Sequence, residues 1–292
     1  MKRVILSLIA ICLAGAANAQ FNMGPQSRMV TDSIYSDVLQ AYRAYTIFIP
    51  KSYDVDSTKQ YPILYLLHGM LDTNAGWEKR GHVKDVMDQL VASGEVCEMI
   101  IVTPNAGGNI FEGAWNGYFN MPGWSYEDFF YQEFMPYIEK TYRVIADKQH
   151  RAIAGLSMGG GGTASYAQRH PDMYCAAYAM SALMNIPQGA ENPSQNPDDK
   201  MVILTKSVME YDCVKYVEEA DDACKEQLRT VQWFVDCGDD DFLLDRNIEF
   251  TQAMRKAQIP CQFRVRDGAH TWEYWHSALY TCLGFVTRCF GE

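Results

Sequence analysis

The stretch that most constrains this chain is RAIAGLSMGGGG, residues 151–162. An apolar, strand-like run leads into Ser157 and then into four consecutive glycines, Gly159 to Gly162. Each glycine inside a helix costs up to about 1 kcal/mol relative to alanine, so this run indicates a helix that must approach its neighbours closely. The letters around Ser157 also fit G-x-S-x-G. Between a strand and a helix, that pattern predicts a nucleophile elbow, a tight turn that holds the serine in a strained conformation.

The alternative interpretation is a flexible glycine loop beside an uninvolved serine. The elbow explains more of the residues, because side chains two positions to either side of the serine would collide across so tight a turn. Gly155 and Gly159 remove those collisions. A close helix also directs its first backbone N–H groups at the serine, where they can stabilise a negatively charged oxygen.

Short apolar runs alternate with longer helical patterns along the chain, which is typical of a mostly parallel sheet covered by helices on both faces. Strands are expected at residues 42–49, 62–67, 99–103, 151–156, 176–180, 231–236 and 262–266. Helices are expected at residues 82–93, 126–142, 159–169, 244–257 and 273–285.

Two long stretches break this alternation. Residues 106–125 are rich in glycine and aromatic residues, and residues 184–228 are polar, acidic and without strand character. Insertions of this length in a compact domain are functional loops or disorder, and the second is expected to be a lid-like insertion that caps the site. Because no Pro/Ser-rich linker divides the chain, residues 20–292 are expected to form one domain.

The N-terminal residues 1–19 have the pattern of a cleaved secretory signal: Lys2 and Arg3, an apolar run, and then Ala17-Asn18-Ala19. A periplasmic or secreted protein is therefore expected. The apolar run is too short to span a bilayer, and no later run is longer, so no membrane anchor is expected. Ile11 stands before Cys12, where a lipidation signal has a small residue, so Cys12 is expected to leave with the signal.

The charge of the mature chain argues against nucleic acid as a partner. Removal of Lys2 and Arg3 from the 25 basic residues leaves 23 against 36 acidic ones. A surplus of about 13 negative charges repels phosphate backbones and anionic lipid.

Eight of the nine cysteines remain after cleavage, an even number that suits an oxidising compartment. A bridge between Cys213 and Cys224 is the first expectation, and Cys282 and Cys289 are candidates to join each other or Cys261. No pair has the C-x-x-C spacing of zinc or redox sites, so no metal site is expected.

A serine hydroxyl is a weak nucleophile near neutral pH and needs a base that an acid holds in place. In elbow enzymes the partners follow in the order Ser, Asp or Glu, His, each in a loop after a strand. The run VQWFVD leads into Asp239, Asp240 and Asp241, and the run QFRVRD leads into His270. His270 is therefore the expected base. Five other histidines are expected to have structural or surface roles, the first of them by shaping its own turn: His68, His82, His150, His170 and His276.

Several stretches together resemble one family: YPILYLLHGM, YEDFFYQEFMPYIEKTYRV, RAIAGLSMGG, RHPDMY, CGDDDFLL and DGAHTWEYW. They span residues 61–275 and are similar to the esterases of the α/β-hydrolase superfamily. That family includes feruloyl and acetyl-xylan esterases, S-formylglutathione hydrolase and the mycobacterial antigen 85 mycolyltransferases. The resemblance implies the α/β-hydrolase fold and a Ser-His-Asp triad that needs no cofactor.

The resemblance also implies particular residues. The family's acid ends a G-x-x-D stretch before a hydrophobic pair, which implies Asp241, with Asp240 as the alternative. Asp239 is expected to belong to a solvated acidic turn or to a cation site. The oxyanion hole is implied at the backbone N–H groups of Met70 and Met158. One departure is Gly161, near which relatives carry a bulkier residue.

The resemblance implies an ester substrate, with feruloyl or acetyl esters on plant polysaccharide as the first choice. Two alternatives remain: an acyltransferase, and a carbohydrate-binding relative without catalysis. Aromatic residues near the expected site either stack on a phenolic or sugar group or pack a long loop: Trp115, Tyr118, Phe119, Trp124 and Trp272.

Overall fold

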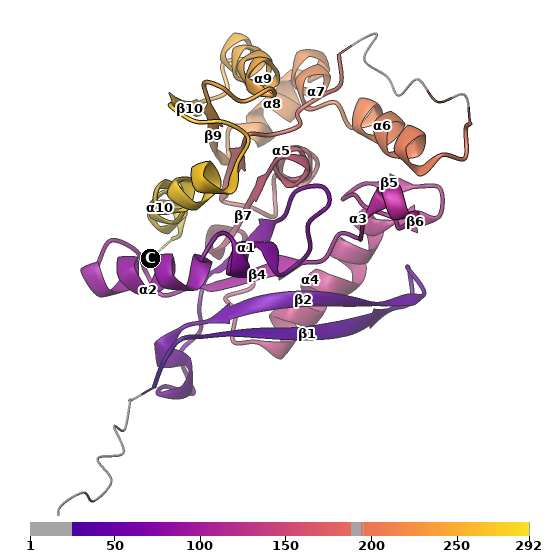
Figure 1. Cartoon of the computed structure of the whole chain (residues 1–292). Coiled ribbons are helices and arrows are strands. Elements are labelled where there is room, and N and C mark those ends of the chain that lie inside the picture. Colours follow the sequence, from indigo (N-terminus) through magenta and orange to yellow (C-terminus); the bar gives the residue numbers. More distant parts are fainter. Residues whose placement is uncertain (1–24, 188–193, 195, 292) are drawn as a thin grey trace, which may run out of the picture.

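The computed structural model describes residues 25–187, 194 and 196–291. An eight-stranded sheet runs through its centre in the order β1-β2-β4-β3-β7-β8-β9-β10 (Figure 1). Its strands are β1 (Arg28–Ser36), β2 (Ala41–Ile49), β3 (Ile63–Leu67), β4 (Ile100–Pro104), β7 (Arg151–Leu156), β8 (Ala176–Met180), β9 (Gln232–Gly238) and β10 (Cys261–Arg266). A separate two-stranded sheet consists of β5 (Asn120–Met121) and β6 (Trp124–Ser125).

The sheet is mostly parallel, as expected. Neighbouring strands from β4 to β10 run parallel, whereas β2 is antiparallel to both β1 and β4. All seven expected strands are present, each within two residues of its expected bounds. The sequence did not predict β1, because this edge strand has exposed residues at its centre and lacks a buried face with clear alternation.

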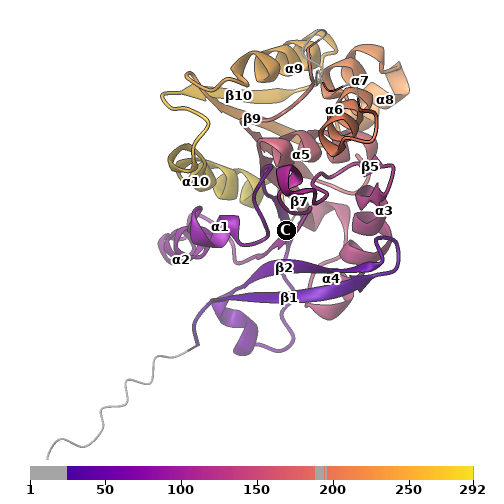
Figure 2. The same cartoon turned by 45° about the vertical axis from the view of Figure 1, so that its right-hand side comes forward.

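Helices cover both faces of the sheet (Figure 2). One face is covered by α1 (Gly76–Lys79), α2 (Val83–Ser93) and α10 (Trp272–Cys289). The other is covered by α3 (Tyr126–Phe129), the π-helical turn η3 (Phe130–Phe134), α4 (Met135–Thr141), α5 (Met158–Arg169) and α9 (Leu244–Lys256). Short 3₁₀ turns complete the connections: η1 (Lys51–Asp54), η2 (Ile110–Glu112) and η4 (Lys148–His150). All five expected helices are present.

The strand that precedes the serine, β7, lies between β3 and β8, and all six of its residues are buried. Successive side chains of a strand point to opposite faces. Ile153 accordingly belongs to the core under α3 to α5, whereas Ala152 and Ala154 belong to the core under α2 and α10. The predicted elbow is thus anchored between two hydrophobic cores.

The segment 184–228 contains three helices among its described residues, α6 (Lys200–Glu210), α7 (Cys213–Glu219) and α8 (Asp222–Leu228). Its acidic residues have a local function that the sequence analysis missed. The side chains of Asp199, Asp212 and Asp221 each accept a backbone N–H in the first turn of the helix that follows. Val217 of α7 and Leu228 of α8 are fully buried, so this part of the insertion belongs to the core. Its role as a cap stays a prediction.

The expected disulfides are not formed. All eight cysteines between residues 25 and 291 are free. Cys213 points into the core, with its Sγ 3.7 Å from the carbonyl oxygen of Gly161, whereas the Sγ of Cys224 lies 3.7 Å from the hydroxyl of Tyr216. Because these two side chains contact different partners, the bridge predicted from their nearness in the sequence does not form. The expected pairings of Cys282, Cys289 and Cys261 are absent as well.

The expected signal, residues 1–19, lies outside the described residues and stays a prediction. Within the part of the chain that the structure describes, no helix is both long and apolar enough to cross a bilayer.

Helix α5 lies so close to the segment after β8 that its glycines are required. A Cβ on Gly161 would lie 2.1 Å from the carbonyl oxygen of Leu183, and one on Gly160 would lie 2.7 Å from the Cβ of Ala182. The departure at Gly161 therefore has a local cause, because the backbone of residue 183 occupies the space that a side chain would fill.

We predict that Gly161→Ala destabilises the protein by about 1–3 kcal/mol, because the added methyl group displaces packed backbone. Gly284→Ala is the matched control, since its Cβ would meet only the flexible end of Arg288 at 3.4 Å. That second variant should gain up to about 1 kcal/mol from better helix propensity. Urea unfolding of both variants measures the difference. Equal stability of the two would contradict the close approach of α5.

Candidate active site

Ser157 stands in the turn between β7 and α5 with φ 56° and ψ −119°. Positive φ is uncommon for a residue with a side chain and is sustained only where surrounding structure enforces it. Two bonds do so here. The Ser157 N–H donates to the carbonyl of Met180 at 2.9 Å, and its own carbonyl accepts from Leu183 N–H at 3.0 Å. The expected strained serine is confirmed.

The glycines at either side of the serine permit this turn. A Cβ on Gly155 would lie 2.4 Å from the carbonyl oxygen of Gly159, and one on Gly159 would lie 2.5 Å from the carbonyl oxygen of His68. Real Cβ atoms do not come that close to backbone oxygen. The collisions expected from the sequence are therefore the ones that glycine removes.

Ser157, His270 and Asp241 form one hydrogen-bonded chain. Ser157 Oγ lies 2.9 Å from His270 Nε2, and His270 Nδ1 lies 2.8 Å from Asp241 Oδ2 and 3.0 Å from Asp241 Oδ1. An ionised carboxylate can only accept, so Nδ1 carries the proton and Nε2 is left to accept from the serine hydroxyl. Three loops that are far apart in the sequence, those after β7, β9 and β10, supply these groups.

The three consecutive aspartates differ in position. Asp241 is buried and faces His270, whereas Asp239 and Asp240 are exposed. Asp239 Oδ1 accepts the backbone N–H of Gly268 at 3.0 Å, and Asp240 N–H donates to the carbonyl of Gly268 at 3.0 Å. These two residues therefore tie the acid loop to the loop that leads to His270. The structure brings Asp241 to the imidazole, and not the alternative Asp240.

Asp241 is held in its ionised form. Burial opposes ionisation, but hydrogen bonds from the His270 ring and from the backbone N–H of Leu243 outweigh it, so the pKa of Asp241 lies below its ordinary value. The bond from Leu243 N to Asp241 Oδ1 is 2.8 Å long.

The two backbone positions expected to bind an oxyanion flank the serine. Met158 is the first residue of α5, so its N–H has no acceptor within the helix. Met70 follows Gly69, where a Cβ would lie 3.4 Å from the Cβ of Ser157. The loop that carries Met70 is thus in contact distance of the serine.

His68 holds that loop in place, as expected, and does not meet Ser157 through its ring. Its Nδ1 donates to the carbonyl of Gly69 at 2.8 Å, and its Nε2 accepts the backbone N–H of Ala106 at 3.0 Å. Burial lowers the pKa of His68, which keeps the ring neutral and suits this pair of bonds. The remaining four histidines have other partners: His82 with His276, His150 with Asp147, and His170 with Glu127.

Three of the five candidate stacking residues are core residues instead. Tyr118, Phe119 and Trp124 are 1%, 6% and 6% exposed. The Tyr118 hydroxyl donates to the carbonyl of His68 at 3.0 Å and accepts the His68 N–H at 2.8 Å, which fixes the strand end before Met70. Trp115 and Trp272 are partly buried. For the first three residues the loop-packing interpretation is therefore correct.

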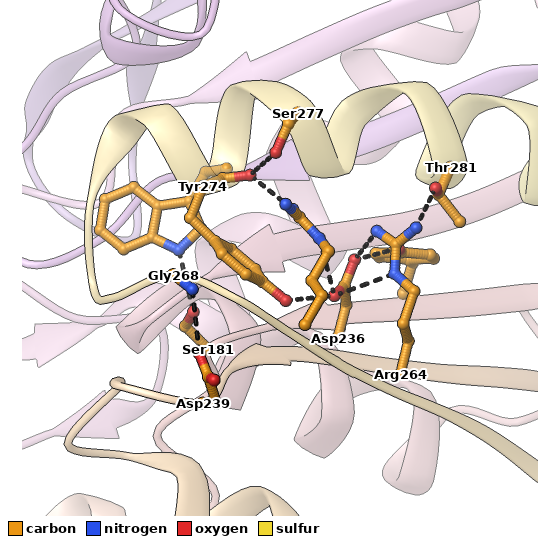
Figure 3. Close-up of polar contacts among 11 residues, drawn as sticks. Ser181, Asp236, Asp239, Arg264, Gly268, Tyr274, Ser277 and Thr281 are labelled. Atoms are coloured by element: carbon orange, nitrogen blue, oxygen red, sulfur yellow. Dashed lines mark hydrogen bonds and ion pairs between the residues drawn. The ribbon is translucent and has the colours of Figure 1, made fainter.

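A buried charge cluster that the sequence analysis missed supports the acid and base loops (Figure 3). Asp236 of β9 is fully buried and accepts from the hydroxyls of Tyr178 at 2.6 Å and Tyr274 at 2.5 Å. Arg264 of β10 forms an ion pair with it, and Arg266 Nε lies 3.8 Å away. Because a buried charge without partners costs several kcal/mol, this set locks β9, β10 and α10 together. The two arginines two positions apart in β10, Arg264 and Arg266, were the available signal.

The imidazole of His270 is also held from the side. The ring of Trp275 meets it edge-on, with centroids 4.8 Å apart and an interplanar angle of 89°. The indole N–H of Trp275 donates to Ser181 Oγ at 3.0 Å. Helix α10, which begins directly after the loop of His270, thus supports the imidazole ring through Trp275.

Among the described residues, no group of three or more His, Cys, Asp or Glu side chains is arranged to hold a metal ion.

Comparison with known proteins agrees with this architecture. Residues 36–286 match the model of the family described as "Putative esterase". A solved structure described as a ferulic acid esterase has 70% sequence identity and a TM-score of 0.88, over 91% of this chain and 99% of that chain. A fluorophosphonate-binding serine hydrolase of Staphylococcus aureus, 21% identical, has a TM-score of 0.74 over 90% of this chain and 99% of that chain, which shows the fold alone.

An endo-1,4-beta-xylanase/feruloyl esterase of Xylanibacter ruminicola is 33% identical over 150 residues, which cover 50% of this chain. The match covers 20% of that relative, so the similarity extends over only a small part of the relative's length.

The fold and these comparisons define the chain as an α/β-hydrolase of the carboxylic ester hydrolase class. It belongs to the esterase family whose model spans residues 36–286.

We predict that Asp241→Asn makes the free energy of unfolding depend less steeply on pH in acid. The pKa of Asp241 is lowered by folding, so its ionised form stabilises the fold above the unfolded pKa of about 3.9, and this stabilisation disappears as pH falls through the folded pKa. The unfolding free energy of the wild type should therefore fall more steeply between about pH 5 and pH 2 than that of the variant. Denaturant titrations at stepped pH measure both slopes.

Asp240→Asn is the control, since Asp240 is exposed and adjacent in sequence. It should keep the wild-type slope. Parallel slopes for the wild type and Asp241→Asn would refute the ionised, hydrogen-bonded state of Asp241.

Proposed function

We propose that the chain hydrolyses carboxylic esters through Ser157 as nucleophile, His270 as general base and acid, and Asp241 as the group that orients and stabilises the imidazole. The observation that carries the proposal is the chain of hydrogen bonds from Ser157 Oγ through both nitrogens of His270 to the carboxylate of Asp241. This arrangement meets the requirement of a weak hydroxyl nucleophile for an adjacent, oriented base.

In the first step, Ser157 Oγ attacks the ester carbonyl while His270 Nε2 takes the hydroxyl proton. The carbonyl oxygen becomes an oxyanion, which the backbone N–H groups of Met70 and Met158 stabilise in the proposed oxyanion hole. The intermediate collapses, the bond to the alcohol oxygen breaks, and the imidazolium gives its proton to that oxygen. The free alcohol leaves, and the acyl group stays on Ser157.

In the second step, His270 takes a proton from water, whose oxygen attacks the acyl carbonyl. The same two N–H groups receive the second oxyanion. When the intermediate collapses, the proton returns from His270 to Ser157 Oγ, and the carboxylic acid is released. The cycle uses only side chains, backbone groups and water.

For the substrate, we propose an ester on plant polysaccharide, with feruloyl as the first choice of acyl group and acetyl as the second. The support is the 70% identity to a structure described as a ferulic acid esterase and the likeness to an endo-1,4-beta-xylanase/feruloyl esterase. The expected secretory signal would bring the enzyme to such a polymer in the periplasm or outside the cell.

We predict that Ser157→Ala lowers kcat/KM for an ester by at least about a thousandfold, and that His270→Ala does the same, because the members of a triad act as a unit. Ser93→Ala at the end of α2 is the matched serine-to-alanine control and should keep wild-type activity. Circular dichroism and thermal unfolding check that the variants are folded. Residual activity of Ser157→Ala above about one part in a thousand would count against the proposed nucleophile.

A panel of methyl ferulate, methyl butyrate and methyl acetate tests the acyl group, because the three esters share one leaving group. We expect kcat/KM for methyl ferulate to exceed that for methyl butyrate by at least about tenfold, the equivalent of 1.4 kcal/mol of transition-state binding. A preference for the shorter acyl groups would overturn the feruloyl assignment and leave the esterase standing. Transfer of the acyl group to an added sugar in preference to water would instead favour an acyltransferase.

A further inference from the structure

The proposed triad has an aromatic neighbour to which the mechanism gives no role. Phe242 directly follows Asp241 and is 76% exposed, more than any other large apolar residue in the described part of the chain. Single exposed apolar residues are common on protein surfaces and need no explanation by themselves. The position of Phe242 is different, because its ring centroid lies 4.5 Å from that of His270, with an interplanar angle of 47°.

The backbone turn after β9 directs the side chain of Phe242 toward solvent. The N–H of Leu243 donates to the Asp241 carboxylate, and the N–H of Leu244 donates to the Asp241 carbonyl at 2.9 Å. Asp241 and Leu243 are 4% and 7% exposed. Since its two neighbours are directed inward, Phe242 is directed outward by the same turn that carries the proposed acid.

The two aromatic residues that contact the imidazole differ in what they leave open. Trp275 meets His270 edge-on and is 6% exposed, so the protein buries nearly all of its surface. Phe242 contacts the same imidazole but leaves most of its surface to solvent. A ligand that comes to His270 from solvent can therefore meet an aromatic surface at Phe242.

The proposed reaction determines which half of an ester comes to His270. The carbonyl oxygen must face the N–H groups of Met70 and Met158. The alcohol oxygen must lie within reach of His270 Nε2, because that nitrogen delivers the proton on which departure depends. The alcohol half of the ester therefore lies on the His270 side of Ser157, where Phe242 is.

We propose that Phe242 forms part of the subsite for the alcohol half of the ester, and that its ligand is the sugar ring of a polysaccharide ester. This inference rests on the proposed function. Phe242 has no hydrogen-bonding group, so it selects for shape and apolar surface, and the C–H face of a sugar ring can pack on an aromatic ring. Phe242 is thus a specificity-determining residue for the leaving group and leaves the choice of acyl group to other residues.

Two ferulate esters that differ only in the alcohol test this subsite: methyl ferulate, and ferulate esterified to a pentose oligosaccharide. The quantity measured is the ratio of kcat/KM for the sugar ester to kcat/KM for the methyl ester. We expect Phe242→Ala to lower this ratio by about threefold to tenfold, the range that aromatic contacts contribute. Phe242→Trp keeps a ring face and should keep the ratio. Tyr42→Ala removes another exposed ring, 68% exposed on β2, and should leave the ratio unchanged.

An unchanged ratio in Phe242→Ala would overturn the inference, and so would an equal loss on both esters with a shifted pH profile, which indicates a structural effect on His270. Because Phe242 is on the surface, its removal leaves no cavity that could unfold the protein. Failure of the proposed function gives a separate result: the wild type would then hydrolyse neither ester faster than Ser157→Ala.

Discussion

Helix α5 packs directly on the ends of the strands beneath it, and this close contact determines the geometry around Ser157. The backbone of Gly159 passes so close to Gly155 and His68 that no Cβ fits at either glycine. Four glycines in one helix each sacrifice up to about 1 kcal/mol of helix propensity, so the two surrounding cores must supply that stability. In return Ser157 is held at positive φ at the tip of the turn. A looser helix would leave the serine free to relax and would move the first N–H groups of α5 away from it.

The charge cluster at Asp236 holds the loops of Asp241 and His270 in place, just as the glycines of α5 hold Ser157 in place. Asp241 and His270 stand five and six residues beyond Asp236 and Arg264, at the ends of adjacent parallel strands. Tyr178, Tyr274 and Arg264 all bond the same buried carboxylate, so β8, β9, β10 and α10 cannot shift independently. Loss of Arg264 would remove the ion-pair partner that lies within hydrogen-bonding distance of this buried carboxylate and would be strongly destabilising. Rigid strands thus deliver the acid and the base to the serine at hydrogen-bonding distance.

Around this rigid centre the two sides of His270 differ. Trp275 fills one side from helix α10, and Phe242 leaves the other open to solvent. The loop of Met70 and Leu71 on the serine's other side is also partly exposed. The proposed site is therefore rigid around Ser157 and His270 and open beside Phe242, which suits the proposed substrate attached to a polymer.

The seven sheet strands after β1, the glycine-flanked turn at Ser157 and the order of Ser157, Asp241 and His270 could be predicted from the sequence. These features are local: a strand's apolar run, a helix period or a collision across one turn is visible in neighbouring letters. Resemblance, and not periodicity, singled out Asp241 among three aspartates. Three features emerge only when the chain is folded: Tyr118 is buried in the core, Cys213 and Cys224 contact different partners, and Asp236 faces two tyrosines and two arginines. Each of these outcomes depends on partners 8 to 58 residues away in the sequence, and burial beside such a partner leaves no periodic signal in the chain.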